Sequence, residues 1–166
     1  AKGLVFDVRE DGGGLVAALE KIVDPLLPAG DIATATYQDG TTKVLVHSDA
    51  NELNLPMMVL VNGNTASAAE LFTASLKDFG KAEVIGEQTF GKGIMQNTFE
   101  LPDGGAVTLT VATYQTTKGE CYHGVGITPD VIMEEDYEKV DFDHPNPEQD
   151  AQLKQAMELL QSKINS

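Results

Sequence analysis

The part of the chain that most constrains its fold is the run of three elements between residues 57 and 86. Residues 57–62 begin with five apolar side chains, residues 67–79 have the composition of a helix, and residues 83–86 carry Val and Ile. A strand, a helix and a strand in this order predict two parallel strands joined by a right-handed crossover. The sequence therefore predicts an α/β protein whose sheet is at least partly parallel.

The remainder of the chain alternates between β-rich and helical segments. Residues 3–8 are typical of a buried strand, and residues 15–23 have apolar side chains at helical spacing. The three glycines at positions 12–14 indicate a turn between them. The other predicted elements are a hairpin, a long strand and a closing helix, at residues 32–37 with 41–47, 106–114 and 148–164.

Length and composition favour one domain. The chain has 166 residues, of which 42% are hydrophobic, so it can bury a substantial core. We find no internal repeat and no boundary, and therefore expect residues 1–166 to form one domain. Residues 134–150 are acidic and contain two prolines, so we expect them to form a solvated linker before the closing helix.

Charge and residue usage exclude several classes of function. The formal net charge of −15 argues against nucleic-acid binding, because phosphate contacts require clustered Lys and Arg. No apolar run approaches the roughly 20 residues that span a bilayer. The single cysteine, Cys121, excludes an internal disulfide. No metal-ligand spacing and no phosphate-binding loop is present, so we expect neither a metal nor another cofactor.

Two residues have the setting that acyl transfer requires. Ser67 follows the strand 57–62 and begins a helix, where free backbone N–H groups and a partial positive charge can hold a developing oxyanion. Lys92 lies 25 positions further on, between Gly91 and Gly93, which allow close approach to neighbouring backbone. The pair is consistent with a serine nucleophile and a lysine general base.

A lysine base needs a special environment. A serine hydroxyl is a weak nucleophile until a base takes its proton. An amine does this only when neutral, and lowering a lysine pKa from about 10.4 to about 7 takes roughly 4 to 5 kcal/mol. Burial among apolar groups is the usual source of such a shift. Phe90, Ile94 and Met95 surround Lys92 in sequence, and we expect them to supply that environment.

These segments resemble motifs of the C-terminal processing peptidases, also called tail-specific proteases. Residues 64–70 resemble the family's Ser-Ala-Ser-Ala-Ser-Glu motif, and residues 89–96 its Phe-Gly-Lys-Gly-x-x-Gln motif. Three more segments match in the same order, at residues 4–14, 101–105 and 124–131. The resemblance implies a serine endopeptidase that cleaves extended or unfolded polypeptides near their C-termini and acts outside the cytoplasm. It also implies a crotonase-like ββα superhelical core, with a mixed sheet and flanking helices.

The resemblance assigns a role to five residues. Ser67 is the nucleophile, Lys92 the general base, and Gln96 the residue that orients the lysine. A glutamine suits this third role because it hydrogen-bonds without adding a charge that would stabilise the ammonium form. The backbone amides of Gly13 and Ala68 form the oxyanion hole.

The chain also departs from the family pattern. Gly12 stands where the family has Pro, Thr65 where it has Ser, and Gln115 and Thr117 where an aromatic residue and Pro are common. Family members usually have a PDZ domain before the core, and nothing similar precedes Ala1. We therefore interpret the chain as an excised catalytic core or a natural minimal version.

Other interpretations stay open at this stage. Ser67 can be a simple helix N-cap, Lys92 a solvated loop residue, and Gln96 a surface residue of a strand. Arg9 and Glu70 are expected to be structural, Arg9 by pairing with a carboxylate and Glu70 by lying near a helix N-terminus. A histidine-based triad finds no support, because none of the three histidines has a triad context. The histidines are His47, His123 and His144.

The alternative functions are a crotonase-like acyl-thioester enzyme and a catalytically silent peptide-binding module.

Overall fold

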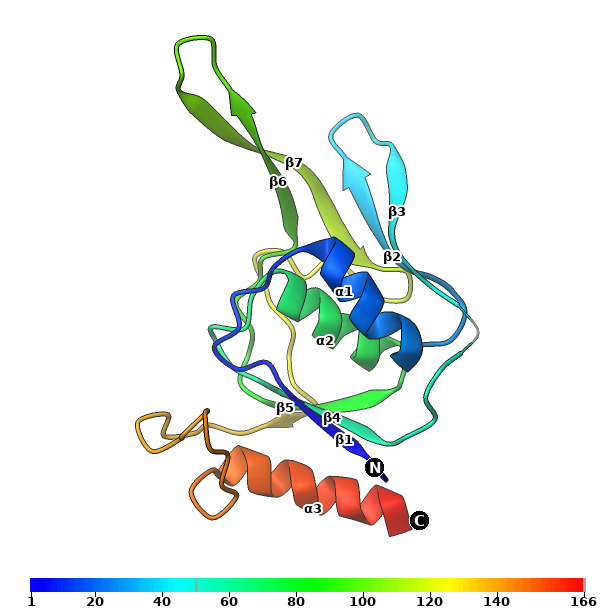
Figure 1. Ribbon diagram of the computed structural model, residues 1–166, viewed down its shortest axis with the longest axis vertical. Helices are drawn as coiled ribbons and strands as arrows, with labels where there is room; N and C mark the ends of the chain where they lie inside the picture. The colour runs from blue at the N-terminus through cyan, green and yellow to red at the C-terminus, as the bar shows by residue number, and fades with distance from the viewer. Residues whose placement is uncertain (50, 166) are drawn as a thin grey trace.

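The computed structural model describes residues 1–49 and 51–165, in which two sheets enclose a pair of helices (Figure 1). The first sheet is parallel and has the strand order β1-β4-β5-β8. Its strands are β1 (Leu4–Asp7), β4 (Met57–Val61), β5 (Ala82–Gly86) and β8 (Val131–Ile132).

The second sheet is antiparallel, with the order β3-β2-β7-β6. It consists of two hairpins whose tips extend away from the helices (Figure 1). β2 spans Gly30–Tyr37, β3 spans Thr42–Ser48, β6 spans Ile94–Glu100 and β7 spans Ala106–Thr116.

Three α-helices complete the layers. α1 (Val16–Val23), which continues into the short 3-10 helix η1 (Asp24–Leu26), and α2 (Ala68–Asp78) lie between the two sheets (Figure 1). α3 (Ala151–Asn165) covers the other face of the parallel sheet. No helix in residues 1–49 and 51–165 is long and apolar enough to cross a membrane.

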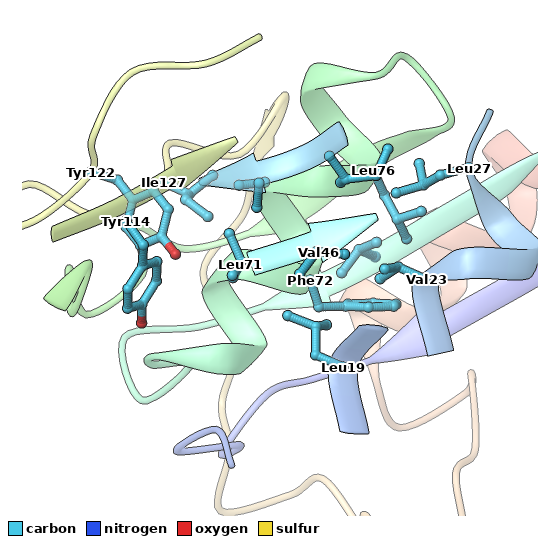
Figure 2. Close-up of a cluster of buried hydrophobic side chains, with 14 of the residues drawn as sticks. Leu19, Val23, Leu27, Val46, Leu71, Phe72, Leu76, Tyr114, Tyr122 and Ile127 are labelled. Carbon is cyan, nitrogen blue, oxygen red and sulfur yellow. The ribbon is translucent and has the colours of Figure 1, made fainter. Parts of the chain in front are cut away.

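The position of β4 inside the parallel sheet explains why its sequence is uniformly apolar. All five residues of β4 are buried, because helices cover both faces of the sheet. Met57, Val59 and Val61 join the main core between the sheets, whereas Met58 and Leu60 pack toward α3. Figure 2 shows the main core, with leucine and valine side chains at one end and Tyr114, Tyr122 and Ile127 at the other.

The predicted elements agree with the observed ones, and the mixed α/β class is confirmed. β4, α2 and β5 form the expected parallel unit, and β2 and β3 form the expected hairpin. The sequence analysis missed β8 and η1, and it placed Gln96 on a strand without giving bounds for β6. It also began the closing helix too early, because the Asp150 carboxylate accepts a hydrogen bond from the Leu153 amide (2.8 Å) and α3 begins at residue 151. Residues 134–150 form no helix or strand and are mostly exposed.

A buried ion-pair cluster fastens the start of α3 to the loop after β1. Arg9 is only 5% exposed and donates hydrogen bonds to both carboxylate oxygens of Asp7 and of Asp150. Its shortest contacts to both are 2.6 Å, and its guanidinium lies over the Phe142 ring. Burial disfavours the charged form, but these carboxylates outweigh it and raise the pKa of Arg9. The prediction that Arg9 pairs with a carboxylate is confirmed.

This cluster predicts an asymmetry between two aspartates. Asp150→Ala leaves a buried guanidinium with one carboxylate, so we expect the unfolding free energy to fall by about 2 to 4 kcal/mol in urea denaturation. The matched control is Asp136→Ala, because Asp136 pairs with Lys139 in an exposed position. We expect no measurable change for the control. Equal stability of the two variants would contradict a structural role for the cluster.

Candidate functional site

Ser67 lies at the N-cap of α2 in an unusual backbone conformation. Its φ of 58° and ψ of −120° place it among only two non-glycine residues with positive φ in the described chain, the other being Glu10. Such conformations cost free energy and persist where surrounding contacts impose them. They are frequent at functional sites, which fits the predicted position of Ser67.

The buried carboxylate of Glu70 holds the Ser67 backbone in place. The side chain is fully buried. Its Oε2 accepts hydrogen bonds from the amides of Ser67 (2.9 Å) and Lys92 (2.7 Å). Its Oε1 accepts from the Thr89 hydroxyl (2.6 Å) and the Gly91 amide (2.7 Å). Glu70 therefore joins the segment of the predicted nucleophile to that of the predicted base. The sequence analysis expected a structural residue here but missed this bridge.

Close backbone packing holds the Lys92 segment from its other side. The Gly124 amide donates to the Gly91 carbonyl (2.9 Å), and the Thr89 amide to the Ile127 carbonyl (3.2 Å). A Cβ on Gly126 would lie 2.2 Å from the Thr89 carbonyl oxygen, which no side chain tolerates. The glycine-rich segments around positions 91 and 126 therefore have a common reason, which is the contact between two backbones.

The surroundings of Lys92 differ in part from the expectation. The Lys92 side chain is half-buried, and it forms no hydrogen bond or ion pair within the described chain. Phe90 is 65% exposed, so the prediction that it shields the lysine is wrong. Met95 is partly buried against the core. Gln96 lies exposed on β6 opposite Thr110, and its side chain makes no hydrogen bond to any described residue.

The two predicted oxyanion-hole residues do lie together. Gly13 has a φ of 89°, and a Cβ on it would lie 2.6 Å from the Ala68 nitrogen. The Gly13 amide, however, donates to Asp11 Oδ1 (2.8 Å). In this conformation the Asp11 carboxylate is therefore hydrogen-bonded to one of the two amides predicted to form the oxyanion hole. The Gly13 and Ala68 backbones are thus close together, but the Gly13 amide is already hydrogen-bonded to Asp11.

An apolar pocket opens beside Gly13 and Ala68. It has a volume of about 330 Å³ and lies against α1 and α2. Its lining is mostly apolar, with Asp7 and Asp11 as its acidic residues. The residues that line it are Phe6, Asp7, Val8, Asp11, Gly13, Gly14, Leu15, Ala18, Leu19, Ile22, Ala68, Ala69 and Phe72.

One further side chain reaches Ser67 that the sequence analysis did not single out. The Tyr114 hydroxyl lies 3.5 Å from Ser67 Oγ and donates to the Lys92 carbonyl oxygen (2.7 Å). No local sequence motif predicts this contact, because the position of Tyr114 depends on how β7 pairs with its neighbouring strands.

The histidines do not hydrogen-bond to Ser67, and the described residues contain no cluster of metal-ligating side chains. His47 and His144 are exposed and pair with aspartates of their own surroundings. His123 Nδ1 lies 3.2 Å from the Gly91 carbonyl oxygen, and none of the histidines hydrogen-bonds to Ser67. In the part of the chain that the structure describes, no three potential metal-ligating side chains gather.

Known proteins share much of this sequence and fold. A carboxyl-terminal-processing protease of Synechocystis is 36% identical over 160 residues, which are 96% of this chain and 37% of that protein. The carboxy-terminal processing protease CtpA of Bacillus subtilis is 38% identical over 144 residues, 86% of this chain and 31% of that protein. A solved photosystem II D1 C-terminal processing protease matches with a TM-score of 0.74 and 38% identity, over 81% of this chain and 35% of that one.

The chain thus spans about a third of the length of these relatives. The family model for peptidase family S41 matches residues 1–133, which include every predicted site residue. The chain belongs to peptidase family S41.

Proposed function

We propose that this chain is the catalytic core of a serine endopeptidase that cleaves polypeptides near their C-termini with a Ser-Lys mechanism. The observation that carries the proposal is the Glu70 bridge. One buried carboxylate binds the amides of both Ser67 and Lys92, two residues that are 25 positions apart in sequence. A helix cap alone needs no such connection to a lysine. The shared core with family relatives also favours the crotonase-like fold.

Each residue has a defined task in this mechanism. Neutral Lys92 accepts the proton of Ser67 Oγ, which attacks the peptide carbonyl carbon. The carbonyl oxygen, now negative, binds the amides of Ala68 and Gly13. The lysine ammonium gives its proton to the departing amine, and water then hydrolyses the acyl-enzyme. Gln96 is proposed to orient the lysine, which requires its exposed side chain to turn toward Lys92 when substrate binds.

The substrate is proposed to bind as an extended strand. β6 begins two residues after Lys92 and is an edge strand of the antiparallel sheet, paired only with β7 among the described strands. Main-chain pairing with such an edge selects unfolded segments and is tolerant of sequence. The apolar pocket beside Ala68 is placed to accept the side chain on the acyl side of the cut bond. By analogy with its relatives, we assign the protein to an extracytoplasmic compartment.

The decisive test removes the two reacting groups one at a time. Ser67→Ala and Lys92→Ala should each lower kcat for an unstructured peptide by at least about 1,000-fold, because the members of such a unit act together. Lys154→Ala, on the exposed side of α3, is the matched control and should keep full activity. Circular dichroism checks that all variants fold. Substantial hydrolysis by either site variant would refute the dyad, and peptide binding by the wild type without cleavage would favour the silent module.

A second prediction concerns the carboxylate at the oxyanion hole. Asp11→Ala frees the Gly13 amide and removes a negative charge next to the position where negative charge develops. We expect kcat to rise by about 3-fold to 10-fold. Asp11→Asn, which removes only the charge, should lie between the wild type and the alanine variant.

Asp39 provides the control for this series. Like Asp11, it accepts a hydrogen bond from the amide two residues later, here that of Thr41 (2.9 Å), but it lies at the tip of a distant hairpin. Asp39→Ala should leave kcat unchanged. A fall in kcat for Asp11→Ala would mean that the carboxylate supports the active loop instead of blocking it.

The pocket yields a third prediction. Ala18 lines the pocket, whereas Ala17 on the same helix does not. Ala18→Leu narrows the pocket, so kcat/KM for a peptide with Leu before the cut bond should fall by about 10-fold or more relative to one with Ala there. Ala17→Leu should leave this ratio unchanged. Identical ratios in both variants would remove the pocket from the substrate path.

A further inference from the structure

The hydroxyl of Tyr114, like the carboxylate of Glu70, contacts the Ser67 and Lys92 segments. Tyr114 lies on β7 and is 3% exposed. Its hydroxyl donates to the Lys92 carbonyl oxygen (2.7 Å) and lies 3.5 Å from Ser67 Oγ, and its own amide donates to the Gly93 carbonyl (3.0 Å). Resting on the proposed function, we propose that Tyr114 is a positioning residue that holds the backbone of Lys92 and the hydroxyl of Ser67 in register for proton transfer.

The chemistry of a phenol explains how one group does both. Burial raises the pKa of Tyr114, so the hydroxyl keeps its proton at neutral pH. Its single proton occupies the short bond to the Lys92 carbonyl. The same hydroxyl lies 3.5 Å from Ser67 Oγ, a separation too long for a strong bond. Tyr114 therefore fixes the Lys92 backbone next to Ser67 Oγ and does not compete strongly with the base for the serine proton.

A neighbouring tyrosine, Tyr122, makes it possible to distinguish the effect of the Tyr114 hydroxyl from that of its ring. Tyr122 packs edge to face against Tyr114, with ring centroids 6.1 Å apart, and both side chains lie at the same end of the core (Figure 2). Tyr122 is 7% exposed, yet its hydroxyl has no hydrogen-bond partner among the described residues. The two rings share one environment, and only one hydroxyl contacts the reacting segments.

The experiment compares Tyr114→Phe with Tyr122→Phe in the full 166-residue chain. We measure kcat and KM on an unstructured peptide, the rate at which a fluorophosphonate labels Ser67, and thermal unfolding. For Tyr114→Phe we expect kcat and the labelling rate to fall by about 10-fold to 100-fold while KM stays within about 2-fold. Tyr122→Phe should match the wild type in both rates.

The outcomes distinguish the two levels of the proposal. If the wild type is active and Tyr114→Phe retains its kcat and labelling rate, Tyr114 does not position the pair, and the Ser-Lys function stands. Equal losses in both variants would assign the effect to core packing and also overturn the inference. If the wild type neither cleaves peptide nor labels at Ser67, the proposed function itself fails.

Discussion

The geometry of the site depends on one buried charge, the carboxylate of Glu70. A carboxylate without partners in a protein interior is costly, and this one is compensated by four donors from two parts of the chain, Ser67 and residues 89–92. The Thr89 hydroxyl, which donates to Glu70, also accepts a hydrogen bond from the Ile127 amide (2.7 Å) and so links Glu70 to the Ile127 segment. The start of α2, the Lys92 segment and the segment after Gly126 are thereby fixed by one anchor.

The two halves of the site are constrained to different degrees. The side with Ser67 and Lys92 is held by Glu70, by backbone hydrogen bonds and by glycine contacts that admit no side chain. Gly13 packs equally closely, since a Cβ on it would lie 2.6 Å from the Ala68 nitrogen, but its amide bonds only to an exposed side chain two residues away. The Ser67 and Lys92 segments are therefore fixed by buried contacts, whereas the Gly13 amide is held by one exposed side-chain hydrogen bond.

The sequence predicts local structure well and the joining of distant segments poorly. The run from β4 to β5 is readable because apolar patterning and helix length are local properties. The role of Glu70 was only partly foreseen, since a charge near a helix start is readable but its contact with the Lys92 amide is not. The contacts of Tyr114 and of Asp11 depend on strand register and on side-chain choices within a loop. The exposure of Phe90 was missed because adjacency in sequence does not place a side chain inside.

The Arg9 cluster has a consequence for how the chain folds. Arg9 and Asp150 are separated by 141 positions, and the central pairing of β1 with β4 also spans some fifty residues. Closing loops of this size costs entropy before the contacts form, so such a topology folds slowly. Arg9 reaches its second carboxylate only when the start of α3 docks. The loop that carries Gly13 therefore receives this support only in a chain whose C-terminal helix has docked.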